Sequence, residues 1–218
     1  MNPNSWQQPV PGEPRGLRVA HVIGRLQIGG AERHFVNLLN AMEGVERHAI
    51  LVGAPGEGPV LDDQLDGAVQ VHRVHVRKRH LRRDLTRLTQ LLKTLDLDVL
   101  HGHMFWASLY GVIAGRMANV PAMFTTEHGE NKWKRPWHRW LERQVISPLV
   151  NQRFCVSSRI LETRREMDRI PASKLRLETN GVPLPDLSGR RIPPEPLIGT
   201  VGRLVTQKAY PLLVQAAA

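Results

Sequence analysis

The chain of 218 residues is poor in cysteine and contains no apolar run long enough to cross a membrane. Its single cysteine, Cys155, excludes an intramolecular disulfide and argues against a zinc site built from cysteines. The first residues lack the charged and apolar regions of a secretory signal, so we expect a cytoplasmic protein. A hydrophobic fraction of 41% and a charged fraction of 23% are ordinary for a globular chain and exclude wholesale disorder.

Acidic residues are also in short supply. Twenty Asp and Glu stand against thirty Lys and Arg, which gives a net charge of +10. This balance favours anionic partners, which include nucleic acid, phosphorylated small molecules and an anionic membrane face. It does not choose among them.

The apolar pattern divides the chain into four parts. Residues 1–16 contain Pro3, Pro11 and Pro14 and no periodic apolar pattern, so we expect a disordered tail. Residues 17–182 alternate short strands with helices, which predicts an α/β domain with a Rossmann-like parallel sheet and helices on both faces. A proline-rich linker over 183–196 separates this domain from 197–218, which reads as the start of a second, incomplete domain.

The spacing of apolar residues predicts the individual elements. The expected strands cover 17–23, 48–52, 69–76, 98–101, 122–126, 153–156, 174–178 and 197–201. The expected helices cover 31–42, 84–95, 105–118, 132–150 (interrupted at its prolines), 158–168 and 210–218. Ligands of parallel α/β sheets bind at the carboxyl ends of the strands. The loops after the first, fourth and fifth strands are therefore the places to search for a site.

The first of these loops contains adjacent glycines, Gly29 and Gly30, just before a helix. Glycines there let a phosphate approach the backbone N–H groups at the helix N-terminus. The same pair is also compatible with a plain turn that opens the helix. The loop is not G-x-G-x-x-G, and no acidic residue ends the second strand, so a nicotinamide cofactor is poorly supported.

Histidines follow the next two strands. His101 and His103 are two residues apart on a strand, so both lie on one side, either as a functional pair or as one structural and one exposed ring. No third ligand is evident for a metal, so we expect none. His128, in Thr125–Gly129, is the strongest candidate to hydrogen-bond a substrate, or else a histidine that supports the site from behind. Glu127 could orient it or face solvent.

Tryptophans and cations alternate after the fifth strand. The segment contains Lys132, Trp133, Lys134, Arg135, Trp137 and Trp140. Amphipathic rings beside cations suit a membrane interface or an anionic acceptor, and stacked nucleic-acid bases would also fit. The alternative is a surface helix whose tryptophans pack on the body of the domain.

Beyond the linker, Arg203 and Lys208 lie five residues apart in a loop between an expected strand and an expected helix. Arginine binds phosphate oxygens with two parallel hydrogen bonds, and lysine adds a point charge. The two cations could converge on one diphosphate.

Taken together, these motifs resemble the retaining glycosyltransferases of family 4, which have the GT-B fold of two Rossmann-like domains. The resemblance runs from about Leu17 to Ala218. Each motif is modest alone, and their order and spacing make the resemblance specific. They are Gly29-Gly-Ala-Glu32, Asp98-Val-Leu-His-Gly-His103, Thr126-Glu-His-Gly129, Phe154-Cys-Val-Ser-Ser158, Asn180-Gly-Val182 and Val201-Gly-Arg-Leu204 with Lys208.

The resemblance implies roles for particular residues. Gly29 and Gly30 would approach the diphosphate of a nucleotide-sugar donor, such as a UDP- or GDP-sugar. His128 would be the catalytic histidine that contacts the transferred sugar. Arg203 and Lys208 would neutralise the leaving diphosphate, so neither a metal nor a cofactor is implied.

The acceptor would be a glycan or a lipid-linked sugar held by the N-terminal domain. Candidates on the acceptor side are Glu32, His101, His103 and Glu127. The protein would then work in polysaccharide biosynthesis, at the inner face of the cell membrane, with no nucleic-acid partner.

The chain departs from the family pattern in two ways. It ends before the pair of glutamates that hold the donor, so we expect a truncated glycosyltransferase that is inactive alone. Ala209 replaces the glycine usual after the lysine. Two other functions stay open, namely a nucleotide-sugar 2-epimerase of the same fold and a non-catalytic basic module that binds anionic glycan, membrane or nucleic acid.

Overall fold

A computed structural model describes residues 15–54, 60–131, 133–186, 188–189, 195, 197, 199–202, 204 and 206–217. Contacts between Cα atoms divide the chain after Pro183 into two units. The expected tail over 1–14 and most of the linker lie outside the described residues. Arg15 belongs to the ordered part, because its guanidinium donates to the Asp98 carboxylate at 2.8 Å, so the expected tail is shorter by at least this residue.

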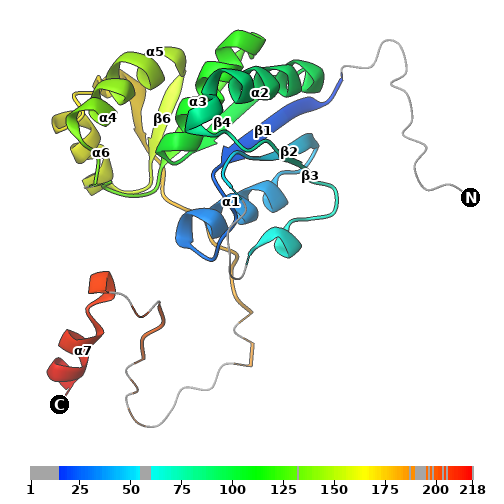
Figure 1. The fold of residues 1–218 in the computed structure, drawn as a ribbon. Helices are drawn as coiled ribbons and strands as arrows, with labels where there is room; N and C mark the ends of the chain where they lie inside the picture. Colours follow the sequence, from blue (N-terminus) through cyan, green and yellow to red (C-terminus); the bar gives the residue numbers. More distant parts are fainter. Residues whose placement is uncertain are drawn as a thin grey trace, which may run out of the picture. The chain divides into compact units, whose positions relative to one another are not determined.

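The first unit is built on one sheet of seven parallel strands in the order β3-β2-β1-β4-β5-β6-β7 (Figure 1). The predicted fold class, an α/β domain with a Rossmann-like parallel sheet, is confirmed. The strands are β1 Leu17–Ile23, β2 Val45–Leu51, β3 Gln70–Arg73, β4 Val99–His103, β5 Ala122–Glu127, β6 Gln152–Cys155 and β7 Leu175–Leu177.

Helices pack on both faces of this sheet. The helices of the first unit are α1 Gly30–Ala41, α2 Leu81–Leu95, α3 Phe105–Ala118, α4 Pro136–Leu141, α5 Ser147–Leu149 and α6 Ser158–Glu166. Apolar residues of α2 and α3 form one core cluster with Val22, Ile50 and Leu100 of the sheet. Helix α1 forms a second cluster on the opposite face, where Phe35 packs near Ile23.

A close approach between α3 and the sheet depends on Gly102. A Cβ added there would lie 2.7 Å from the Cα of Ser108. The helix therefore packs directly on β4 at this residue.

Several elements differ from the sequence-based prediction. The third strand is shorter than expected, and the helix predicted from residue 132 begins only at Pro136, because proline suits the first helical position. It then passes through a π turn, Glu142–Ile146, before α5. Among the described residues of 197–201 there is no strand, because the described part of that unit offers no second strand to share its hydrogen bonds.

The second unit contains a helix, α7 Tyr210–Ala217, after a short 3₁₀ turn over Thr206–Lys208. No helix within the described ranges is both long and apolar enough to span a bilayer.

Candidate active site

The strand order reverses at β1, which lies between β2 and β4. Chain segments leave the carboxyl ends of β1 and β4 in opposite directions at such a point, which opens a crevice for ligands. Met104, the residue that follows β4, has a φ of 66°, in the region that disfavours a side chain. Strain of this kind is concentrated at functional sites.

Four histidines gather at this crevice on the face of the sheet that α1 covers. His21 on β1 is paired in register with His101 on β4, and His103 lies on the same face two residues further on. His128 directly follows β5. His34 of α1 joins them from above the sheet, with its ring centroid 5.2 Å from that of His128.

Three of these rings form a continuous chain of hydrogen bonds. Nδ1 of His21 lies 2.9 Å from Nε2 of His103, and Nδ1 of His103 lies 3.1 Å from Nε2 of His128. The two outer nitrogens, Nε2 of His21 and Nδ1 of His128, are buried and have no hydrogen-bond partner. Such atoms are rare in folded proteins. The free end at His128 is therefore a place for a ligand oxygen or a water molecule.

All of these imidazoles are held neutral. Burial, and then the proximity of His34, lowers the pKa of His21 to about 3 and that of His128 to about 4. Burial and the neighbouring histidines keep the pKa values of His101 and His103 well below the usual 6.5. At neutral pH, each ring therefore carries one N–H donor and one acceptor nitrogen.

The same neutral state is the one that binds metals. In the described part of the chain, His21, His101 and His103 place one nitrogen each within 4.8 Å of one another. The sequence argument against a metal rested on a missing third ligand, and the structure supplies one in His21. In the structure, however, His21 and His103 bind each other, and Nε2 of His101 lies 2.7 Å from the Thr126 hydroxyl.

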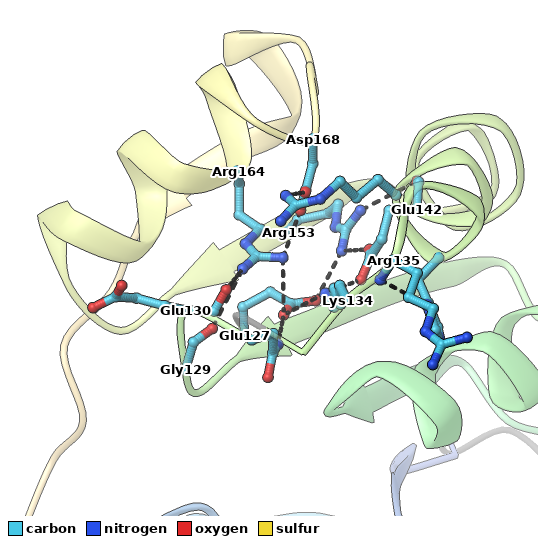
Figure 2. A network of polar contacts seen from close by, with 12 residues as sticks. Glu127, Gly129, Glu130, Lys134, Arg135, Glu142, Arg153, Arg164 and Asp168 are labelled. Carbon is cyan, nitrogen blue, oxygen red and sulfur yellow. Dashed lines mark hydrogen bonds and ion pairs between the residues drawn. The ribbon is translucent and has the colours of Figure 1, made fainter. Parts of the chain in front are cut away.

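The loop that carries His128 is anchored by a network of buried charges (Figure 2). Its members are Glu127, Lys134, Glu142, Arg153, Arg164 and Asp168, whose side chains are all inaccessible to solvent. Three carboxylates face three cations, so the set is electrically balanced. Charges can be buried when they are paired and hydrogen-bonded in this way.

Glu127 is the centre of the network. One carboxylate oxygen accepts from Arg153 at 2.9 Å, and the other accepts from Asn131 at 3.0 Å and from Lys134 at 3.5 Å. Burial opposes its ionisation, but the cations of Lys134, Arg153 and Arg164 outweigh burial and lower its pKa to about 2.

Two predicted roles are corrected by this network. Glu127 does not face solvent, and its carboxylate is fully used by buried cations. Lys134 likewise cannot touch a membrane surface, because its ammonium lies between Glu127 and Glu142. Arg164 extends the anchor to the loop itself by donating to the carbonyls of Gly129 and Glu130 (Figure 2).

The glycine pair lies at the start of α1. Gly29 is the N-cap residue, and nothing lies within 4 Å of a Cβ added at Gly30. A Cβ added at Gly29 would instead meet the carboxylate of Glu32 at 2.3 Å. Gly30 is thus open to a ligand, whereas an anion at Gly29 requires the Glu32 side chain to move.

The family is decided by the sequence profile of Glycosyltransferase Family 4, which matches residues 28–185. The chain belongs to this family. No curated protein matches it.

Solved structures agree with the fold of this family-4 chain. The Anabaena protein HepE, in complex with UDP and glucose, has a TM-score of 0.62 and 11% identity over 76% of this chain and 45% of its own. A glycosyltransferase from Rickettsia africae ESF-5 has a TM-score of 0.63 and 16% identity over 78% and 44%.

A UDP-N-acetylglucosamine 2-epimerase has a TM-score of 0.57 and 17% identity over 76% and 49%. Identities this low show the fold alone. The family-4 chain spans less than half of the length of each of these proteins.

Three further predicted site residues of the family-4 chain belong to the second unit or lie outside the described residues. Lys208 is exposed in the second unit, and Arg203 and Lys132 are not among the described residues. Ala209, which stands where glycine is usual, has a φ of 49°. This left-handed conformation is the physical reason for the family's glycine.

The tryptophans of the segment after β5 are partly exposed. Trp133, Trp137 and Trp140 have exposed fractions of 52%, 47% and 54%. Trp137 stacks on the buried His138, with 3.5 Å between ring centroids. Trp133 and Trp137 thus combine exposure with packing against rings of the domain, namely Phe105 for Trp133 and His138 for Trp137.

Proposed function

We propose that the chain is the acceptor-side domain, with the first part of the donor-side domain, of a hexosyltransferase that moves a sugar from a nucleotide-sugar to a polysaccharide or glycolipid acceptor with retention of configuration. The observation that carries this proposal is the buried, unpartnered Nδ1 of His128 at the crevice of a family-4 sheet. A sugar oxygen would satisfy this atom.

Two adjoining cavities provide room for the acceptor. One, of about 380 Å³, is lined by Gly24, Arg25, Gly53, Arg73 and His75, among others, at the carboxyl ends of β1 to β3. The other, of about 190 Å³, shares its two glycines and adds an ammonium and two aromatic rings, Lys78, Trp106 and Tyr110. Cations beside aromatic rings suit an acceptor that combines a sugar with a phosphate.

The donor would place its diphosphate near Gly30. The role of Arg203 and Lys208 as the cations that neutralise the leaving group stays a prediction from the resemblance. Departure of a nucleoside diphosphate develops negative charge, which fixed cations stabilise without a metal ion. HepE, a protein of the same fold, was crystallised with UDP and glucose, which supports a nucleotide-sugar donor.

The experiment is saturation-transfer NMR of the chain with UDP-glucose and GDP-mannose, because this method detects weak contacts. We expect signals from the sugar protons that weaken in His128→Ala and persist in His80→Ala, a matched substitution at an exposed histidine. Equal signals in both variants, or no binding to either nucleotide-sugar, would contradict the proposal. We expect no release of nucleoside diphosphate, because the chain spans less than half of the length of its structural relatives.

A 2-epimerase of the same fold is the second candidate, since one such enzyme is a structural neighbour. The two functions differ in their need for an acceptor. Conversion of UDP-N-acetylglucosamine to its 2-epimer without any acceptor would favour the epimerase.

We also propose that the domain rests on an anionic membrane through Trp133, Trp137 and Trp140 with the exposed Arg135. Amphipathic rings and a cation are suited to the headgroup region. Flotation with vesicles of anionic lipid should carry the wild-type chain and lose the Trp133→Ala/Trp137→Ala variant. Equal flotation with neutral vesicles would contradict this.

A further inference from the structure

The three hydrogen-bonded imidazoles of His21, His103 and His128 allow only two arrangements of their protons. Each neutral ring has one N–H and one acceptor nitrogen, and each of the two hydrogen bonds uses one proton. The third proton must therefore lie on one of the two outer nitrogens of this row of three imidazoles. It is either on Nδ1 of His128 or on Nε2 of His21.

The surroundings of the two ends differ. The ring of His21 is 1% exposed, with Phe35 packed edge-on at a centroid distance of 6.0 Å. An N–H at this end would stay buried without an acceptor, which disfavours this arrangement. The ring of His128 is only half-buried and follows β5 at the crevice, so although its Nδ1 is itself buried, a ligand or water oxygen that enters the crevice could accept from it.

We propose that His21 and His103 are positioning residues that hold His128 as a hydrogen-bond donor, with its proton on Nδ1. In this arrangement His21 donates through Nδ1 to His103, and His103 donates through Nδ1 to Nε2 of His128. The proposal deepens the proposed function, because it takes from it that the partner of Nδ1 is a sugar oxygen.

The side chains around the three hydrogen-bonded imidazoles favour the neutral form of these rings. His34 of α1 and His101 of β4 are themselves neutral. The carboxylate of Glu127 on β5 is committed to buried cations. The charge of Glu127 raises the pKa of His128, but burial and the proximity of His34 outweigh it, so this ring stays neutral.

The hydrogen bonds between the imidazoles also explain why a histidine occupies position 21. No motif marks this residue, which lies in the middle of an ordinary apolar strand. Among the described residues, its Nδ1 is the hydrogen-bond partner of Nε2 of His103. A purely apolar residue there would leave His103 free to reverse its tautomer, and His128 with it.

The test is imidazole ¹⁵N NMR of the chain labelled at histidine, at a pH near 7.5, with signals assigned by single His→Gln variants. We expect His21, His103 and His128 all to be protonated on Nδ1. This is the tautomer that free histidine disfavours in water, so the result would not arise by default. A His128 ring protonated on Nε2 would overturn the proposal.

Two substitutions at position 21 test whether the tautomer of His128 depends on the N–H that His21 donates. His21→Asn keeps an N–H near the position of Nδ1 and should leave the tautomer of His128 unchanged. His21→Phe fills the space without a donor and should shift His103 and His128 together toward the Nε2 tautomer. An unchanged His128 in the folded His21→Phe variant would overturn the coupling, and if that variant does not fold, the wild-type tautomers still decide.

Chelation separates this proposal from a metal site at the same rings. The tautomers should be the same before and after treatment with EDTA. A pattern that changes on chelation would overturn the proposal, because a metal rather than protons would then hold the nitrogens. None of these readings needs a sugar, so failure to bind a nucleotide-sugar would count against the proposed function and leave the tautomer result intact.

Discussion

Replacing Glu127 with glutamine should strongly destabilise the domain, although the two side chains have nearly the same shape. The substitution removes one of three carboxylates that balance three buried cations, and it leaves Arg153 and Lys134 partly unpaired in a dry site. Removing one partner of a buried ion pair costs about 3–5 kcal/mol. For a chain of this size, that loss corresponds to a fall in melting temperature of roughly 6–20 °C.

The lowered pKa of Glu127 has the same sign as this predicted loss. Its value falls from 4.5 to about 2 in the folded chain. The ionised carboxylate therefore contributes to the stability of the folded chain. Because the folded pKa is the lower one, the contribution is complete above about pH 4.5 and is lost as the pH falls toward 2.

The assay is urea unfolding at pH 7, followed by circular dichroism. The control is the double variant Glu127→Gln/Lys134→Met, which restores equal numbers of buried carboxylates and cations. It should be more stable than Glu127→Gln alone. The reasoning is refuted if Glu127→Gln costs less than about 1 kcal/mol, the range of an exposed ion pair, or if the two substitutions simply add.

Three further predictions concern stability. Folded pKa values of about 3 for His21 and about 4 for His128 mean that these rings protonate on unfolding, so the urea midpoint should fall as the pH drops from 6.5 toward 4; a flat profile over this range would contradict their burial. Gly102→Ala should cost about 1–3 kcal/mol through its clash with Ser108, whereas Gly30→Ala, in open space, should unfold at the wild-type urea concentration. Ser157→Ala should lower the free energy of unfolding by about 1 kcal/mol, because the Ser157 hydroxyl caps α6, whereas Ser157→Asn should keep most of this stability.

Local sequence patterns predicted most of the sheet. The strand Leu17–Ile23 and the helix Phe105–Ala118 were expected at their observed bounds. These elements are specified by features within a few residues, such as apolar spacing and a terminating glycine or asparagine. The order of the motifs also sufficed to point to family 4.

The sequence-based predictions that were wrong share a physical cause. In each, the structure of the residue depends on a partner that is distant in the sequence. Residues 197–201 have the composition of a strand, but a strand also needs a neighbour. Lys134 has the local context of a surface cation, and only the approach of Glu127 and Glu142 buries it.

The residues of the candidate site likewise divide into those that local sequence predicted and those that only the tertiary structure brought to the site. The sequence by itself determined that His101, His103 and His128 lie at or near the carboxyl ends of two consecutive strands, because strand period and motif are local properties. Only the tertiary structure decided that His21 joins them and that Glu127 is closed off by cations. Both facts depend on pairing between strands β1, β4, β5 and β6, whose residues lie far apart in the chain.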